Sequence, residues 1–227
     1  MNSEAKSKSD AQGKYTIEKV SSGVYTIEFE KAHYNFPQLS NVQISPTNPN
    51  LPIVKVEAFE VCGKITINEA LFPIKRSIKL QGNDVSLTTS TDSKGAFCFS
   101  VKPGEYEIQP IISESEIEKS LLFEPRSLSV TINNKPELDL QFRQIKVSIS
   151  GSVECLHPPC DSFDVVLFSL NNLNDKKSVS LKNTNDFLFN EVYPGNYIIR
   201  VNQPNWCWDS NQLTLRVREF TLFYFIF

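Results

Sequence analysis

The chain has 227 residues, 40% of them hydrophobic, and a formal net charge of −3. This near-neutral balance lacks the basic character of a general nucleic-acid-binding protein, and the apolar content excludes a wholly disordered chain. The five cysteines are too few for a disulfide-dense miniprotein, and their odd number leaves at least one unpaired in a monomer. The length allows one domain or as many as three small ones.

The two ends carry no recognisable targeting segment. Residues 1–15 have no apolar stretch and so do not form a secretory signal peptide. Residues 220–227 are strongly apolar but far fewer than the about 20 residues that a spanning helix needs. We interpret this tail as a terminal strand, the start of a missing helix or an aberrant end. Membrane attachment is therefore expected only through segments outside this chain.

One frame occurs three times along the chain: a strand with alternating aromatic residues, a turn, and a second strand that carries a tyrosine. The copies span residues 13–27, 95–108 and 186–199. Equivalent positions hold Tyr25, Tyr106 and Tyr197. A spacing of about 80–90 residues is too long for a solenoid repeat and indicates a row of separately cored domains.

The residue types of the middle copy explain the frame. Phe97 and Phe99 are two positions apart and therefore point to one face of a strand. Pro103 and Gly104 are typical of a β-turn, in which Pro sets φ and Gly accepts a positive φ. Tyr106 begins another alternating run, which predicts a second strand paired with the first as a hairpin. We expect its phenol to reach a backbone partner at the edge of a sandwich.

Alternating apolar residues also mark the strands that open and close each complete unit. The opening strands are predicted at residues 59–67 and 147–153, and the closing strands at residues 128–132 and 213–217. These signals divide the chain into a truncated first unit (1–57), a complete second unit (58–144), a complete third unit (145–219) and the apolar tail 220–227.

The whole pattern predicts an all-β protein of tandem Ig-like or prealbumin-like β-sandwiches with almost no helix. Residues 113–122 begin with a capping-box sequence and form either one short helix or a solvated loop. Because the first unit holds only part of the pattern, we expect it to be ordered only by packing on the second unit, or not at all.

The sequence offers no catalytic, cofactor-binding or metal-binding motif. His33 and His157 are the only histidines, and they fall in different units without a motif around either. Cys155, His157 and Cys160 resemble a ligand cluster, but a structural zinc site needs four ligands and a stiff Pro-Pro pair separates two of these. We therefore expect a non-enzymatic protein without a bound metal or cofactor.

The cysteines leave several pairings open. Cys62 and Cys98 are expected on the outward face of their strands, as a disulfide or as two unpaired thiols. Cys155 and Cys160 would close a small disulfide loop, or one of them would pair with Cys207. Any such disulfide would indicate an oxidising compartment.

Trp206 and Trp208 lie two residues apart and share one face of a strand. If they are exposed, their indoles would stack on sugar rings or anchor a protein partner. The alternative is that they fill a core or cover the edge of a sheet.

A series of short motifs carries a family resemblance. In order, these are Phe59-Glu-Val-Cys-Gly63-Lys-Ile, Gly95-Ala-Phe-Cys98-Phe, Lys102-Pro-Gly-Glu-Tyr106, Leu122-Phe-Glu-Pro125, Val147-Ser-Ile-Ser-Gly151-Ser-Val-Glu-Cys155, Cys160 and Trp206-Cys-Trp208. The repeated frame alone is generic to carboxypeptidase-regulatory-like domains and the wider carbohydrate-binding-like fold. The ordered series resembles the C-terminal lumenal repeats of the nodal modulator family over about residues 7–218, and departs from them after Val217.

The resemblance implies a type I membrane protein of the endoplasmic reticulum whose lumenal part is a string of Ig-like sandwiches. It also implies association with nicalin and a small multipass subunit, in a complex that serves the biogenesis of multipass membrane proteins, and a link to antagonism of Nodal signalling. The family brings no catalytic residues.

Three functions remain open at this stage. The first is a non-enzymatic lumenal scaffold, and the second is a carbohydrate-binding module that uses Trp206, Trp208 or exposed tyrosines to hold a glycan. The third is an accessory domain of a metallocarboxypeptidase-like enzyme, which would require a zinc catalytic domain that this chain does not contain.

Overall fold

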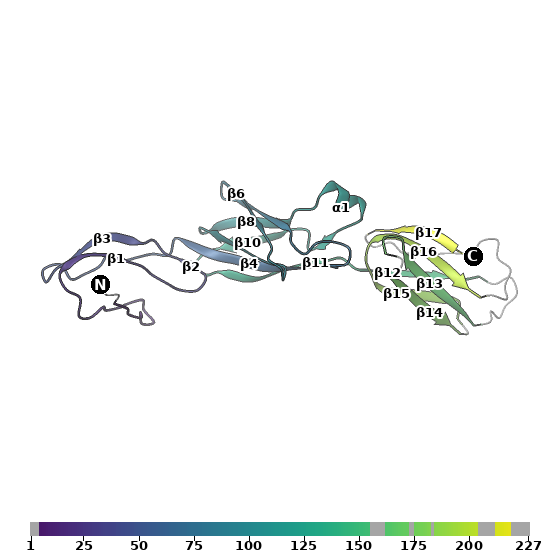
Figure 1. Ribbon diagram of the computed structural model, residues 1–227, viewed down its shortest axis with the longest axis horizontal. Coiled ribbons are helices and arrows are strands. Elements are labelled where there is room, and N and C mark those ends of the chain that lie inside the picture. The colour runs from purple at the N-terminus through teal and green to yellow at the C-terminus, as the bar shows by residue number, and fades with distance from the viewer. Residues whose placement is uncertain (1–4, 155–161, 173–174, 183, 204–211, 219–227) are drawn as a thin grey trace.

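The computed structural model describes residues 5–154, 162–172, 175–182, 184–203 and 212–218. The regular secondary structure in these ranges is almost entirely β-strand, and no helix in them is long and apolar enough to cross a bilayer. The elements (Figure 1) are β1 (Gly23–Ile27), β2 (Tyr34–Asn35), β3 (Leu39–Ile44), β4 (Ala58–Thr66), β5 (Ser77–Gly82), β6 (Val85–Ser90), β7 (Ala96–Val101), β8 (Gly104–Pro110), α1 (Glu114–Glu118), β9 (Phe123–Glu124), β10 (Leu128–Ile132), β11 (Glu137–Gln144), β12 (Val147–Ser152), β13 (Phe163–Ser169), β14 (Lys176–Leu181), β15 (Asp186–Val192), β16 (Gly195–Asn202) and β17 (Gln212–Val217). The predicted all-β class is confirmed, and residues 114–118 form the short helix.

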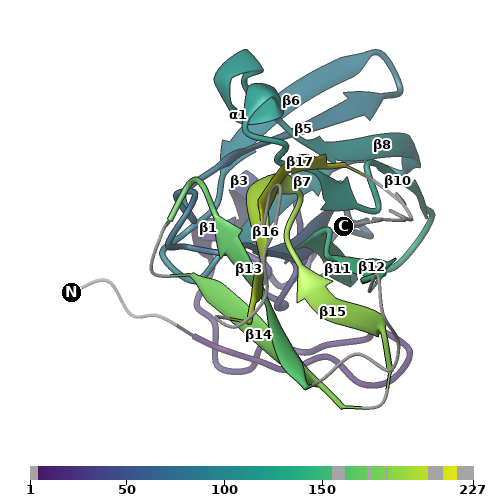
Figure 2. The same cartoon turned by 90° about the vertical axis from the view of Figure 1, so that its right-hand side faces the viewer.

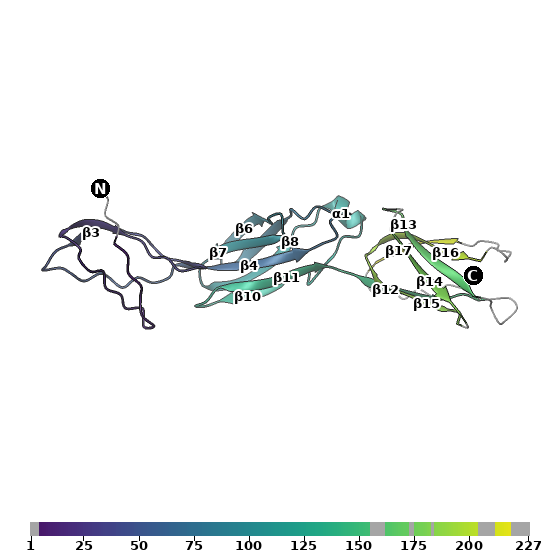
Figure 3. The ribbon, with the colours of Figure 1, turned by 60° about the horizontal axis from the view of Figure 1, so that its bottom comes forward.

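The elements are arranged as an elongated row. Strands β1 and β3 lie at one end, β4 to β11 in the middle and β12 to β17 at the other end (Figures 1 and 3). Seen along the long axis of the row, these groups lie one behind another (Figure 2).

The middle group is a sandwich of two sheets. One sheet has the order β10-β8-β5-β6, and the other has the order β2-β4-β11-β9, with β7 also paired to β4. Alternate side chains of both sheets meet in one core, whose fully buried members include Val61, Ile65, Ile78, Leu80, Ile108 and Phe142. Burial of each such side chain contributes about 1.5–3 kcal/mol to folding.

The third unit repeats this design with sheets of order β12-β15 and β14-β13-β16-β17. Its core includes the fully buried Ile149, Val165, Ile199 and Val201. Only Ile145 and Lys146 separate β11 from β12. Ile145 is itself buried, and its N–H donates to the Leu122 carbonyl at 3.0 Å. The link between the two sandwiches is therefore short and anchored.

The aromatic strand and the tyrosine strand of each complete unit do not form a hairpin. β7 pairs with β4 in one sheet, whereas β8 pairs with β5 and β10 in the other. In the third unit, β15 pairs with β12, whereas β16 pairs with β13 and β17. The hairpin prediction is wrong because alternating apolar residues on both strands suit two facing sheets as well as two neighbouring strands. The turn carries the chain across the edge of the sandwich.

A tyrosine hydroxyl closes the turn before the tyrosine strand in all three units. The Oη atoms of Tyr25, Tyr106 and Tyr197 donate to the carbonyls of Ser21, Lys102 and Tyr193 at 2.8, 2.8 and 2.7 Å. The predicted backbone partner is thus confirmed, and it is always the carbonyl four residues upstream. Burial of the ring raises the pKa of the Tyr197 phenol well above its usual value, so this phenol stays a donor.

The glycine of the Pro-Gly pair plays a different part from the one predicted. Among the described glycines, a positive φ occurs at Gly13, Gly82 and Gly95, not at Gly104 or Gly195. Gly104 begins β8, and a Cβ there would lie 3.0 Å from Asn83 Cγ. The predicted positive φ is therefore wrong, because the chain leaves this corner directly into a strand. At Gly104 a side chain would instead crowd that of Asn83.

The first unit has no buried residue within its described range, residues 5–57. Its strands β1 and β3 form a two-stranded antiparallel sheet, and an isolated pair of strands is marginally stable at best. β2, in contrast, pairs with β4 and so belongs to a sheet of the second unit. That this unit orders only by packing on the second remains a prediction.

Gly63 lies where β4 is most crowded. β4 pairs with β7 on one side and, in parallel, with β11 on the other. A Cβ at Gly63 would lie 2.5 Å from Leu140 O, 2.6 Å from Leu140 Cβ and 2.7 Å from Phe97 Cζ. Since the Leu140 carbonyl belongs to a paired strand, the site has no room for a methyl group.

Replacement of Gly63 by Ala is expected to lower the free energy of unfolding by about 1–3 kcal/mol, the usual cost of overpacking a core. Urea denaturation followed by circular dichroism measures the change. Gly195→Ala is the matched control, because its nearest neighbours lie 3.5 Å away, in ordinary contact. A Gly63→Ala chain as stable as the parent would contradict the described packing.

Candidate functional site: the two junctions between units

The first junction joins the first unit to the second through a short strand pair. β2 pairs antiparallel with the start of β4. The Glu60 N–H donates to the His33 carbonyl at 3.0 Å and extends this ladder. The ring of Tyr34 packs edge-on against that of Phe59, with 5.5 Å between the centroids. Both backbone and side-chain contacts therefore hold residues 33–35 to β4.

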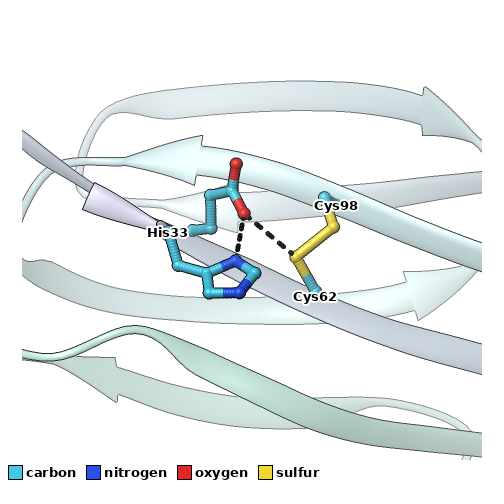
Figure 4. The surroundings of a disulfide bond; sticks show 4 residues. His33, Cys62 and Cys98 are labelled. Atoms are coloured by element: carbon cyan, nitrogen blue, oxygen red, sulfur yellow. Dashed lines mark hydrogen bonds and ion pairs between the residues drawn. A yellow bond between two sulfur atoms is a disulfide. The ribbon is translucent and has the colours of Figure 1, made fainter. Parts of the chain in front are cut away.

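Four side chains gather on the outer face of the sheet beside this ladder (Figure 4). Cys62 and Cys98 occupy directly opposite positions on β4 and β7 and form a disulfide, with 4.1 Å between their Cα atoms. His33 Nδ1 and Glu60 Oε2 lie 2.6 Å apart. Glu60 Oε2 also lies 3.8 Å from Cys62 Sγ, but a disulfide sulfur has no proton to donate, so this is a contact and not a hydrogen bond.

The two sulfurs differ in accessibility. Cys62 keeps only 9% of its surface exposed, whereas Cys98 is exposed. Val61 and Phe97 point into the core, and both cysteines point to the other face of the sheet, as the alternation predicts. On that face Cys62 contacts Cys98 and the Glu60 carboxylate. Solution thiols therefore reach the disulfide from the Cys98 side.

Beside the second junction, the second unit holds an ion pair that is buried at its arginine end. Arg76 immediately precedes β5, and only 3% of its side chain is exposed. Its guanidinium donates to both carboxylate oxygens of Glu116, at 2.8 and 3.1 Å. The guanidinium also lies over the ring of Phe123, 5.5 Å from the centroid. Helix α1 and the segment after it are thereby fastened to the sandwich.

Arg76 sets the charge state of Glu116. Its hydrogen bonds, with help from the N–H and hydroxyl of Ser113, lower the pKa of Glu116 from 4.5 to about 2 although partial burial opposes the shift. The third unit contacts the same helix, because Arg216 Nη2 donates to the Glu118 carbonyl at 3.2 Å. α1 is therefore held from both sides of the second junction.

A cleft of about 330 Å³ lies beside this junction. The second unit lines it with Asn68 and Ala70, and the third unit lines it mainly with Asn172, Asp175, Lys177, Glu191, Tyr193 and Tyr197. Lys177 donates to the Glu191 carbonyl at 2.8 Å, and Lys146 donates to the Glu191 carboxylate at 2.6 Å. The Lys146 contact lowers the pKa of Glu191. Lys146 and Glu191 therefore neutralise each other, and these contacts lie within the third unit.

Cys62 and Cys98 are the predicted site residues that the structure describes. Cys155, His157, Cys160, Trp206, Cys207, Trp208 and the tail 220–227 lie outside the described residues. Sequence reasoning missed the pairs His33–Glu60 and Arg76–Glu116, whose members are 27 and 40 residues apart. The capping box that begins at Ser113 indicated a helix there, but nothing in the sequence indicated its partner.

Two family models match adjacent parts of the chain. The model described as the NOMO fifth transthyretin-like domain matches residues 60–142. The model described as the second beta sandwich domain of a BOS complex subunit NOMO1-like protein matches residues 146–222. Together the two matches cover more than half of the chain.

Similar proteins include BOS complex subunit NOMO1 from Homo sapiens and from Mus musculus, each 34% identical over 229 residues. Nicotinic receptor-associated protein 4 from Caenorhabditis elegans is 27% identical over 223 residues. Each alignment covers 96% of this chain and 19% of the relative, so the chain spans about a fifth of the length of these proteins.

Solved structures that resemble the chain share less sequence identity with it than these relatives do. The Bacillus anthracis TIE protein superposes with a TM-score of 0.48 and 10% identity, over 97% of this chain and 44% of that one. The major pilin protein T-13 from Streptococcus pyogenes superposes with a TM-score of 0.39 and 7% identity, over 75% of this chain and 95% of that one.

Replacement of Glu116 by Gln is expected to destabilise the chain by about 2–3 kcal/mol at pH 7, because it leaves the buried Arg76 without a counter-charge. This loss is below that of a fully buried pair, since 19% of the Glu116 side chain is exposed. Denaturation in urea measures it, and Glu114→Gln, at an exposed position of the same helix, is the control.

The Glu116 contribution should also depend on pH. Its folded pKa of about 2 lies below the ordinary 4.5, so the unfolded chain takes up the proton first. The stabilisation is complete above about pH 5 and is lost as the pH falls from 4.5 towards 2. The stability difference between the parent chain and Glu116→Gln should shrink in that range. A difference that stays constant from pH 6 to pH 2.5 would disprove this role for Glu116.

Removal of the Cys62–Cys98 disulfide is expected to cost about 2–4 kcal/mol, because the bridge restrains a loop across 36 residues in the unfolded chain. The test compares the parent with Cys62→Ala/Cys98→Ala in urea and EDTA, with and without dithiothreitol. The variant should be less stable than the oxidised parent, and the two should converge once the parent is reduced. Equal stability under oxidising conditions would show that the bridge contributes nothing.

Proposed function

The chain belongs to the nodal modulator (NOMO) family, and from this membership we propose that it acts as a non-enzymatic scaffold segment in a membrane-protein complex. The name BOS complex subunit, carried by the NOMO1 relatives, supports a role in assembly. The family models that match the chain describe a transthyretin-like domain and a β-sandwich domain. The fold and the names of the relatives together favour a role in binding and spacing partner proteins over a role in catalysis.

The observation that carries the proposal is the anchored connection of both junctions. β2 shares a sheet with β4, and only two residues link β11 to β12. Ile145 is buried in that link, and Arg216 contacts helix α1 across the junction. Such connections resist bending, so the row suits a spacer that holds partner-binding surfaces at set distances.

The specific partners form the finer part of this proposal. We propose that the segment lies in the lumen of the endoplasmic reticulum and acts with nicalin and a small multipass subunit in the biogenesis of multipass membrane proteins. The Cys62–Cys98 disulfide agrees with an oxidising compartment. The chain would then meet the membrane only through other parts of the complete protein.

Capture from membranes tests this role. The tagged chain, directed to the endoplasmic reticulum of cultured cells, is purified in mild detergent and its companions are identified by mass spectrometry. We expect nicalin to be enriched over its level with an unrelated β-sandwich carrying the same tag. A matched variant receives a flexible Gly-Ser insert of about six residues between Ile145 and Lys146, which keeps both cores but removes the fixed spacing.

The variant is expected to fold like the parent, by circular dichroism, and to capture less nicalin. Equal capture by both chains would contradict the spacer role while leaving the partnership intact. Absence of nicalin from both would contradict the partnership. Saturable binding on a glycan array, without any membrane partner, would favour the carbohydrate-binding module instead.

A further inference from the structure

We propose that the reduced chain binds one zinc ion at the first junction through His33, Glu60, Cys62 and Cys98. The oxidised chain cannot form this site, because both sulfurs are used in the disulfide. The site goes beyond the scaffold role and does not depend on it. It would make the attachment of the first unit sensitive to both thiol redox state and zinc.

Three of the four donors already converge. In the part of the chain that the structure describes, the donor atoms of Glu60, Cys62 and Cys98 lie within 4.8 Å of one another. The fourth donor, His33 Nδ1, lies 2.6 Å from Glu60 Oε2 but outside that group of three, so the exposed imidazole must move towards the sulfurs to complete the site. The four side chains come from three segments of chain and meet on one outer face of the sheet (Figure 4).

The backbone around the cluster is set by neighbouring structure. Cys62 and Cys98 are cross-strand partners, so strand pairing keeps their side chains together after the bond between them is broken. His33 has a φ of 69°, a left-handed conformation that is uncommon for residues other than glycine. Its carbonyl accepts from the Glu60 N–H, which holds the imidazole beside the carboxylate.

The donor types fit zinc. Thiolate, imidazole and carboxylate are its usual protein ligands, and four of them complete a closed tetrahedral site. Bonds of about 2.0–2.3 Å place the donors of such a site roughly 3.3–3.8 Å apart. The 3.8 Å between Glu60 Oε2 and Cys62 Sγ matches this spacing. The imidazole and carboxylate would need to separate by less than about 1 Å, and the two sulfurs, once the bond between them is broken, would need to move apart to about 3.8 Å.

Reduction must come first, and a dithiol supplies the electrons. A dithiol thiolate attacks the exposed Cys98 sulfur, and Cys62 leaves as a thiolate that takes up a proton. The second thiol of the reductant then displaces Cys98 and closes a cyclic disulfide. The dithiol has lost two electrons, and the chain has gained two electrons and two protons. Zinc binding then displaces both thiol protons into solvent.

The two states differ in what they connect. The disulfide joins only β4 to β7, within the second unit. The zinc site would in addition hold His33 of the first unit. The bound metal would therefore protect residues 31–36 from hydrogen exchange, which ordinary capture of zinc by exposed thiols would not do.

The test first reduces the full chain with a dithiol, which is then removed under nitrogen because it would itself bind zinc. Zinc is titrated into this reduced chain and, in parallel, into the oxidised chain, and binding is measured by calorimetry. The reduced parent should bind one more zinc ion per chain than reduced Cys62→Ser/Cys98→Ser. Cys155, Cys160 and Cys207 are present in both chains, so the difference isolates the proposed site. The oxidised parent should lack this extra ion.

His33→Ala and Glu60→Gln, which keep every thiol, should each weaken binding of this ion at least about tenfold. Glu57→Gln, an exposed carboxylate close in sequence, is the matched control and should bind as the parent does. Zinc should also slow exchange of residues 31–36 in the reduced parent and not in His33→Ala.

Equal zinc stoichiometry in the reduced parent and the Cys62→Ser/Cys98→Ser chain would overturn the proposal. If that double variant fails to fold, the zinc affinities of His33→Ala and Glu60→Gln, which each remove one ligand, test the proposal instead. Affinities of His33→Ala and Glu60→Gln within about twofold of the parent would overturn it equally.

Discussion

The hydrogen bond from a tyrosine hydroxyl to the carbonyl four residues upstream is the interaction on which the architecture depends. In both complete units it closes the corner where the chain passes from one sheet to the other. The ring packs in the core while its hydroxyl donates to a carbonyl at the edge of the sandwich. Each sandwich is thereby closed by one side chain that serves core and turn together.

The junctions turn separate sandwiches into one row, and they do so by different means. The first uses backbone pairing, because β2 completes part of the sheet that contains β4. The second uses a two-residue link with the buried Ile145, and Arg216 also contacts helix α1, which the Arg76–Glu116 ion pair fastens to the second unit. The strand pair at the first junction is held by backbone hydrogen bonds, which do not depend on pH. The ion pair beside the second junction is lost when the Glu116 carboxylate is protonated. The two joints should therefore respond to different conditions.

The repeated pattern was enough to predict the all-β class, the tyrosine partner and several strands of each complete unit. It did not predict β5, β13 or β14, and residues 13–17, expected to form the aromatic strand of the first copy, form no strand. It failed where one local pattern fits two arrangements. Alternation on β7 and β8 is the same whether the strands are neighbours in a sheet or face each other across a core. The Pro-Gly pair favoured a positive φ, but Gly104 has none, and a side chain there would crowd that of Asn83.

The sequence by itself determined which residues face a core and which residues bend the chain, because both are properties of local spacing and residue type. It also revealed the family, through short motifs in a fixed order. Only the tertiary structure decided which strands pair, that Cys62 on β4 and Cys98 on β7 form a disulfide, and that His33 and Arg76 each meet a carboxylate. These contacts join residues 27 to 40 positions apart, and no local pattern encodes a partner at that distance.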